Sequence, residues 1–201
     1  TELCGPFDAA QRAWRRAGLP EGPWESWCVA GPVARARDAL AGEAQAHLLI
    51  VNTDADCVIG GHADACRRVL ARLPGARVRP LGYAIVAHAP ELAEAGPAWR
   101  DLHRRPTCPI DQPRLYGAAA AAAYAPTEAS AEAALYGQAI RTLDFPAVIR
   151  RAHADGVRIF LELGPRGLCS GWIREILGDR PHLALALDRP GHDGLHLLWD
   201  C

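Results

Sequence analysis

The sequence of 201 residues contains no methionine, not even at position 1, so we expect a fragment, a processed product or a piece of a longer chain. No apolar run approaches the about 20 residues that a membrane-spanning helix needs. The first residues also lack the basic and then apolar pattern of a signal peptide. These absences lead us to expect a cytoplasmic protein that has no membrane partner.

Cysteine is present but never forms a C-x-x-C pair, and the count of seven is odd. This pattern argues against a disulfide framework and favours buried free thiols. The 22 basic and 23 acidic residues are scattered and leave a formal net charge of -1. Because no basic cluster is available to neutralise phosphates, we expect no nucleic-acid partner.

The first part of the chain has the pattern of a ferredoxin-like layer. An amphipathic helix is predicted first, and alternating apolar runs and helical spacings then follow, over residues 8–17, 24–30, 33–40, 47–51, 57–59, 63–73 and 77–81. After the first helix this order is βαββαβ, the split arrangement of a ferredoxin-like layer. Such a layer serves many purposes and does not by itself indicate a chemistry.

The middle of the chain is less regular. Residues 78–90 read as an alternating apolar run that ends in His88. A helix over 91–103, interrupted or started by Pro97, and an extended connection over 104–114 are expected next. The run Ala118–Ala123 fits a helix by propensity and a short buried strand by its flanking tyrosines, and we favour the strand. Thr127 then caps a helix that runs to about residue 140.

The last third has the clearest alternation of helix and strand. Asp144 and Pro146 open a helix that continues to Ala154, and a buried strand is predicted over 157–163. A G-P-R-G turn leads into another helix, and a final strand covers 182–187. This alternation predicts a parallel sheet.

Three stretches together resemble the acyltransferase domains of type I fatty acid and polyketide synthases: LLIVNTDADCVIGGHADACRRVLARL, LGYAIVAHAP and LDFPAVIRRAHADGVRIFLELGPRGLCSGWIREIL. The last is most similar to the subgroup found in polyunsaturated fatty acid, heterocyst glycolipid and enediyne-type synthases. The resemblance implies an α/β fold in which a ferredoxin-like subdomain is inserted into an α/β-hydrolase-like acyltransferase domain. It assigns residues 1–27 to a lead-in helix of the large subdomain, 28–81 to the ferredoxin-like insert and 82–201 to the C-terminal part of the large subdomain.

The resemblance also implies a reaction. In the family an acyl group, commonly malonyl, moves from coenzyme A to an enzyme serine and then to the phosphopantetheine thiol of an acyl carrier protein. No tightly bound cofactor is implied, and the partners are acyl carrier protein and other domains of a multidomain synthase. His88 matches the catalytic histidine, and Asn52 matches an asparagine that lines the acyl site. Imidazole, with a pKa near about 6.5, is suited to take the serine proton and return it to the leaving thiol.

The sequence departs from the family in two ways. Ala89 and Pro90 follow His88, where many relatives have serine. The G-H-S-x-G elbow that carries the serine nucleophile is also missing, since the serines of this chain are Ser26, Ser130 and Ser170. The oxyanion glutamine and the arginine that binds a malonyl carboxylate are missing as well. We therefore expect the fragment alone to be inactive, and the acyl group cannot be chosen.

Each candidate residue also has a structural interpretation. His88 can be a core or edge histidine, Asn52 a turn residue bonded to its own backbone, and Glu162 of the E-L-G-P motif a strand-end carboxylate bonded to nearby amides. Cys57, His62 and Cys66 are only three potential metal ligands, and structural zinc takes four, so we expect no metal site.

Two other functions stay open. Gly167 to Gly171 has the G-x-C-x-G form of a nucleophile elbow, and Asp188, His192 and His196 follow Cys169 in the order of a thiol hydrolase. Alternatively the chain is a truncated acyltransferase remnant that serves as a docking or linker module in a megasynthase. An exposed apolar patch in place of the missing half would suit that role.

Overall fold

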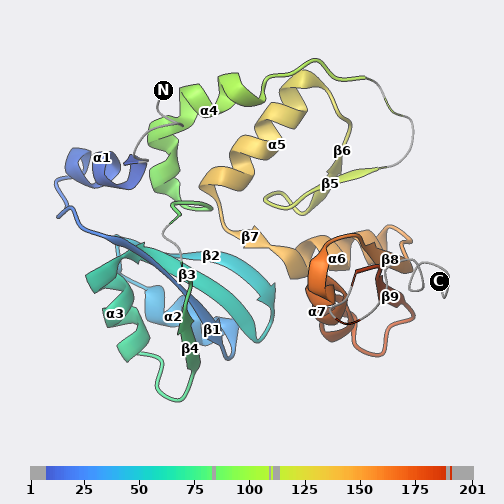
Figure 1. Ribbon diagram of the computed structural model, residues 1–201, viewed down its shortest axis with the longest axis horizontal. Coiled ribbons are helices and arrows are strands. Elements are labelled where there is room, and N and C mark those ends of the chain that lie inside the picture. Colours follow the sequence, from blue (N-terminus) through green and yellow to red (C-terminus); the bar gives the residue numbers. More distant parts are fainter. Residues whose placement is uncertain (1–7, 83–84, 109, 111–113, 189–190, 192–201) are drawn as a thin grey trace. The chain divides into compact units, whose positions relative to one another are not determined.

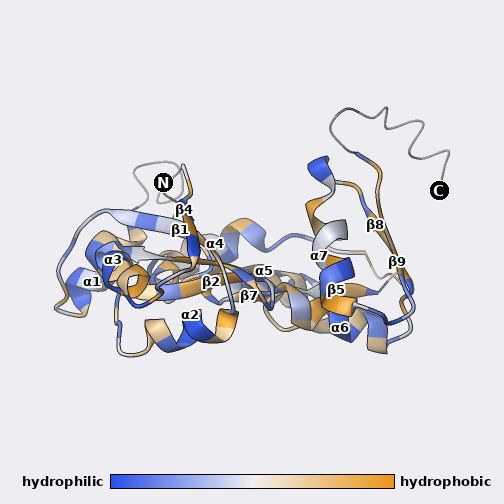
Figure 2. Ribbon diagram, turned by 90° about the horizontal axis from the view of Figure 1, so that it is seen from below, coloured by the Kyte–Doolittle hydropathy of each residue, from blue (hydrophilic) through white to orange (hydrophobic). Residues whose placement is uncertain are grey.

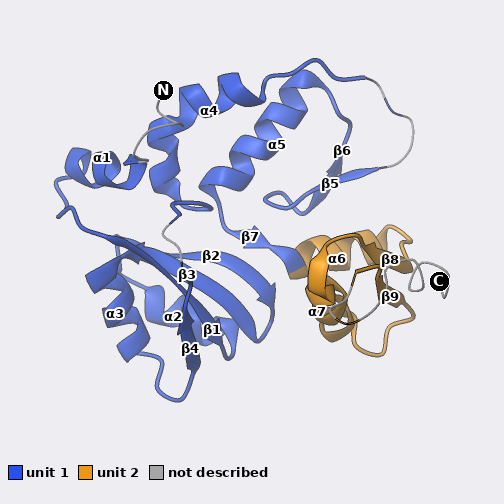
Figure 3. Cartoon of the chain, in the orientation of Figure 1, with its two compact units in different colours: residues 1–145 blue, residues 146–201 orange. Residues whose placement is uncertain are grey.

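The computed structural model describes residues 8–82, 85–108, 110, 114–188 and 191. The chain divides into two compact units, residues 1–145 and 146–201, which are described separately (Figure 3). Within the described ranges, no helix has both the length and the apolar character needed to cross a membrane.

Unit 1 contains a five-stranded sheet in the order β4-β1-β3-β2-β7 (Figure 1). Its strands are β1 (Trp24–Ala30), β2 (Ala46–Thr53), β3 (Asp56–His62), β4 (Arg77–Pro80) and β7 (Leu143–Asp144). The first four pair antiparallel, whereas β7 joins β2 in parallel. With α2 (Val33–Leu40) and α3 (Ala63–Ala71) between strands, this is the predicted βαββαβ layer. The strand β1 begins four residues before residue 28, where the sequence placed the start of the insert.

The two faces of this sheet bury two separate apolar clusters. Successive side chains of a strand point to opposite faces, so Leu48 and Leu49 belong to different clusters. One cluster packs against α2 and α3. The other packs against α1 (Ala9–Arg16) and the segment around His88, and it includes Trp14, Val86 and Ala89. The second face therefore holds the His88 segment against the sheet.

Close approach of β2 and β3 requires glycine in the V-I-G-G sequence. Gly61 pairs with Ala46 across the two strands. A Cβ added at Gly61 would lie 2.0 Å from the carbonyl oxygen of Gln45, far inside contact distance. The second glycine of the motif is thus a packing requirement of the sheet.

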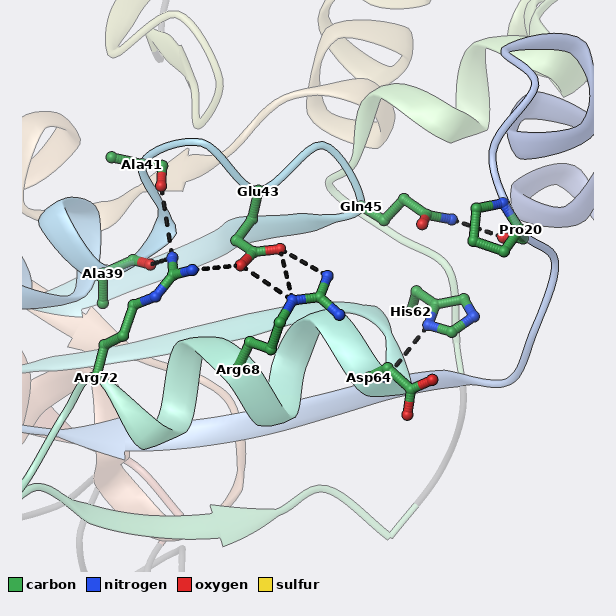
Figure 4. Close-up of polar contacts among 9 residues, drawn as sticks. All are labelled: Pro20, Ala39, Ala41, Glu43, Gln45, His62, Asp64, Arg68 and Arg72. Atoms are coloured by element: carbon green, nitrogen blue, oxygen red, sulfur yellow. Dashed lines mark hydrogen bonds and ion pairs between the residues drawn. The ribbon is translucent and has the colours of Figure 1, made fainter.

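Figure 4 shows the polar contacts that hold α3 at its start and along its exposed side. At its start, the His62 Nδ1 atom accepts a hydrogen bond from the Asp64 backbone N–H, at 3.2 Å. Along its exposed side, Arg68 and Arg72 approach the carboxylate of Glu43 at 2.8 and 2.7 Å. Glu43 lies in the connection between α2 and β2, so these ion pairs join that connection to α3.

In the remainder of unit 1 the alanine-rich segment differs from the prediction, and the short strand β7 was not expected. The elements are the 3₁₀ helix η1 (Pro90–Ala95), α4 (Gly96–His103), β5 (Leu115–Gly117), β6 (Ala122–Tyr124) and α5 (Glu128–Ile140). Pro97 is the second residue of α4 and follows η1 closely, which agrees with the expectation that it interrupts or starts the helix. The single strand over Ala118–Ala123 was wrong, because most of these alanines form the turn between β5 and β6 and Ala121 has a φ of 48°. Thr127 caps α5 as predicted, since its hydroxyl accepts from the Ser130 N–H.

The described residues of unit 2 form a two-stranded parallel sheet, two α-helices and the short 3₁₀ helix η2 (Pro165–Gly167). The α-helices and strands are α6 (Phe145–Ala154), β8 (Ile159–Glu162), α7 (Leu168–Leu177) and β9 (Leu183–Ala186). The parallel pairing confirms the prediction, but the expectation of a fully buried β8 was wrong. Ile159 and Leu161 are 62% and 53% exposed. Figure 2 colours the ribbon by hydropathy and labels β8, the strand to which both residues belong. Alternation along the strand places them on one face, and both remain exposed among the described residues of unit 2.

Candidate active site

His88 does not close a strand, contrary to the sequence interpretation. The strand β4 ends at Pro80, and the described residues between Pro80 and His88 have no regular structure. His88 itself adopts a φ of 58°, in the left-handed region that residues other than glycine rarely occupy. The segment instead reaches the sheet through its neighbours Val86 and Ala89, which are buried in the second apolar cluster.

The C-terminal end of α5 orients the imidazole of His88. Its Nδ1 atom lies 2.7 Å from the carbonyl oxygen of Gln138, and the Ala89 N–H donates to the carbonyl of Ala139. Both carbonyls belong to the last turn of α5, where no partner exists within the helix. Because a carbonyl only accepts, Nδ1 carries the hydrogen and the neutral ring keeps Nε2 as its acceptor.

Two cavities of unit 1 meet at His88. The larger, of about 680 Å³, has a mainly apolar lining that includes Trp24, Val86, Leu92 and Trp99. The smaller, of about 550 Å³, is lined by His88 together with polar and apolar side chains from α2, β2 and the end of α5, including Arg37, His47 and Arg141. The His88 imidazole therefore lines both cavities, and each is large enough to hold a small ligand.

Asn52 lies elsewhere on the sheet. It is 9% exposed, and its Nδ2 group donates to the Asp56 carboxylate at 2.6 Å. It is not among the residues that line either cavity at His88. The described part of the chain therefore does not bring Asn52 and His88 together, and the acyl-site role of Asn52 stays a prediction.

Sequence reasoning missed Glu91, three residues after His88. Its carboxylate is 5% exposed and accepts hydrogen bonds from the Trp14 Nε1–H, at 3.0 Å, and from His47 Nε2, at 2.7 Å. Burial acts to raise the pKa of Glu91, but the hydrogen bond and charge of His47 outweigh it and hold the pKa below its usual value. Nothing in the sequence separates Glu91 from Glu94, because the partners Trp14 and His47 are distant along the chain.

The potential metal ligands are not arranged as a site. Cys57 and Cys66 are fully buried in the first apolar cluster, and burial raises the pKa of each thiol to about 12. His62 is occupied in capping α3. Across the described ranges, no group of three or more histidine, cysteine, aspartate or glutamate side chains is placed to hold a metal ion.

The candidate thiol elbow is a helix start rather than an activated site. Cys169 is the second residue of α7 and is half-buried, and burial followed by the charge of Glu162 raises its pKa. A thiol nucleophile requires the opposite shift. Of its suggested partners, Asp188 is exposed, whereas His192 and His196 lie outside the described residues.

Comparison with known proteins supports the resemblance found in the sequence. No family model matches the chain. One of the subunits of the polyunsaturated fatty acid synthase of Thraustochytrium sp. is 26% identical over 202 residues, which cover 93% of this chain and 10% of the relative. The chain is homologous to this synthase polypeptide, and it spans only about one tenth of the relative's length.

Solved structures share the fold. The acyltransferase domain from the second module of the salinomycin polyketide synthase matches with a TM-score of 0.76 and 22% identity, over 96% of this chain and 45% of that one. A malonyl-CoA:acyl carrier protein transacylase from Xanthomonas oryzae pv. oryzae matches with a TM-score of 0.75 and 22% identity, over 95% and 62% of the two chains. The α/β fold of this chain is that of acyltransferase domains, and the chain spans about half of their length.

Proposed function

We propose that this chain is the C-terminal part of an acyltransferase domain and that His88 is its general base and acid. The observation that carries the proposal is the bond between His88 Nδ1 and the Gln138 carbonyl, which leaves Nε2 as the acceptor. Homology to a fatty acid synthase polypeptide and the acyltransferase fold support the same reaction class.

The first half of the reaction forms a serine ester. His88 Nε2 takes the proton of a serine hydroxyl, and the serine oxygen attacks the carbonyl carbon of an acyl or malonyl coenzyme A thioester. The carbon–sulfur bond then breaks, and the imidazolium returns the proton to the coenzyme A thiolate. The serine comes from outside this chain, since none of its serines lies in a G-H-S-x-G sequence.

The second half passes the acyl group to acyl carrier protein. The thiol of the carrier's phosphopantetheine loses its proton to Nε2 and attacks the serine ester, and the serine oxygen recovers that proton as it leaves. The other domains of a multidomain synthase are further proposed partners, and the reaction requires no tightly bound cofactor.

Intact-mass analysis tests this function. The 201-residue chain is incubated with malonyl- and acetyl-coenzyme A, and the same is done with a longer protein that includes an upstream G-H-S-x-G segment. We expect no adduct on the short chain and a serine ester on the longer one. His88→Ala in the longer protein should slow transfer by about 10²- to 10⁴-fold. Unchanged transfer in that variant, or an acyl thioester on Cys169, would contradict the proposal.

One observation favours a second role, that of a docking or linker remnant. The β8–β9 face of unit 2 exposes apolar side chains that parallel sheets normally bury on both faces, including Ile159, Leu161 and Leu183. A remnant would present this face to another part of a synthase. The upstream sequence separates the two roles, because a serine elbow supports the enzyme and a different complete domain supports the remnant.

A further inference from the structure

A buried carboxylate follows the candidate catalytic histidine. Glu91 is 5% exposed, and its two hydrogen bonds reach α1 through Trp14 and β2 through His47. Its second oxygen, Oε2, is buried and has no hydrogen-bond partner among the described residues. Three elements that are distant in sequence thus meet at one carboxylate.

This arrangement is costly if its purpose is stability alone. Removing a carboxylate from water is unfavourable even when it is paired, and an unpaired buried oxygen adds to that cost. The neighbouring buried positions Ala89, Leu92 and Ala95 are occupied by apolar residues, which pack at no such cost. Packing alone therefore does not explain why position 91 holds a glutamate.

The backbone at His88 supplies a reason. A residue other than glycine held in the left-handed region persists only where its surroundings fix it, and His88 has a φ of 58°. One anchor is the bond from the Ala89 N–H to the Ala139 carbonyl, at 3.2 Å. Glu91 is the next polar anchor along the chain, one turn further into η1.

We propose that Glu91 is a positioning residue for His88. It fastens the turn after His88 to the sheet through His47 and to α1 through Trp14. This keeps Nδ1 on the Gln138 carbonyl and so leaves Nε2 as the acceptor. His47 and His88 line the same cavity of about 550 Å³, so the anchored pair forms part of the wall beside the imidazole.

The significance of the inference rests on the proposed function, but its test reads only the imidazole of His88. The 201-residue chain is labelled with ¹⁵N, and the ring nitrogen shifts of His88 are measured at a pH where the ring is neutral. A His88→Gln variant identifies the signals. In the wild type we expect the Nδ1–H tautomer, with its proton protected from exchange.

Two matched variants then separate positioning from general effects of charge. Glu91→Gln keeps the size and one acceptor but removes the charge that holds His47, and it should cause loss of Nδ1–H protection and a mixture of tautomers. Glu94→Gln is the control, because Glu94 lies in the same 3₁₀ helix and pairs instead with Arg16, at 3.1 Å. It should leave the His88 signals unchanged.

A second change keeps the inference testable if Glu91→Gln does not fold. Trp14→Phe retains an aromatic ring beside Trp24 and removes the indole donor to Glu91 together with part of the ring volume. It should shift the tautomer population in the same direction by a smaller amount. Either variant, folded and with unchanged His88 signals, overturns the positioning role. Failure of the proposed function appears separately, as transfer that survives His88→Ala.

Discussion

The carboxylate of Glu162 accepts two hydrogen bonds from Ser170, one from its backbone N–H at 2.7 Å and one from its hydroxyl at 2.8 Å. Ser170 is the third residue of α7, where backbone N–H groups have no partner within the helix. A carboxylate is also favoured at this positive end of the helix. Glu162 therefore joins the end of β8 to the start of α7, which confirms the structural interpretation of the acid in the E-L-G-P motif.

Glu162→Ala should lower the free energy of unfolding by about 1–2 kcal/mol, because it removes the cap of α7 and leaves the buried Ser170 hydroxyl without its acceptor. Urea unfolding followed by circular dichroism measures the change. Glu175→Ala is the control, since Glu175 is exposed on the same helix. Equal effects of the two substitutions would contradict the capping role.

Thiol labelling should follow burial. Cys57 and Cys66 have pKa values raised to about 12 by burial, whereas Cys108 is exposed. We expect iodoacetamide at about pH 8 to modify Cys108 in the folded chain and to reach Cys57 and Cys66 only after urea is added, because the thiolate is the reactive form. Peptide mapping by mass spectrometry reads the sites. Labelling of Cys57 at the rate of Cys108 would show that the core is open.

Glu43 should make stability depend on pH. The hydrogen bond from Arg68, acting against burial, holds the Glu43 pKa below its ordinary value. A lowered folded pKa gives stability that is present above the unfolded pKa of about 4.3 and is lost as pH falls through the folded value.

Glu43→Gln should accordingly reduce stability at pH 7 by about 1 kcal/mol or less, since Arg68 and Arg72 are largely exposed and solvent screens the pairs. The difference should decrease as the pH falls below the unfolded pKa of about 4.3 and vanish once the folded carboxyl group is protonated, which urea midpoints measured at several pH values will show. Glu21→Gln removes the exposed pair with Arg15 and should have a smaller effect. A difference that persists at low pH would exclude the ionic origin.

Gly61→Ala should destabilise the sheet by at least about 2 kcal/mol, because the new Cβ meets the backbone of Gln45 and one strand must move. Gly82→Ala is the matched control, since a Cβ there meets nothing within 4 Å. Thermal unfolding of both variants gives the comparison. A Gly61 variant as stable as the Gly82 variant would mean that β2 and β3 separate easily.

The ferredoxin-like layer could be predicted because the apolar residues of each element recur at the spacing typical of a strand or of a helix. Alternation along β2 and helical spacing in α3 both reflect burial on one side, and burial is what the pattern records. The hairpin at Ala118–Ala123 was missed because alanine fits several conformations, and the left-handed Ala121 has no sequence signal. A run of alanines therefore does not specify one secondary structure.

The site was only partly predictable. His88 was found through its resemblance to a family, but its left-handed backbone and its bond to Gln138 depend on packing between segments 50 residues apart. Glu91 was missed for the same reason. The burial predicted for β8 assumed that a parallel strand is covered on both faces, whereas one face of β8 is exposed among the described residues of unit 2.

The outer strand β4 limits how this sheet can associate. Its four residues, Arg77 to Pro80, are all exposed at the open end of the strand order. An unprotected edge invites another chain to add a strand, and such growth leads to aggregation. Two arginines repel an approaching copy of the same edge, and proline offers no N–H to extend the ladder. The edge of the sheet therefore discourages polymerisation of this chain.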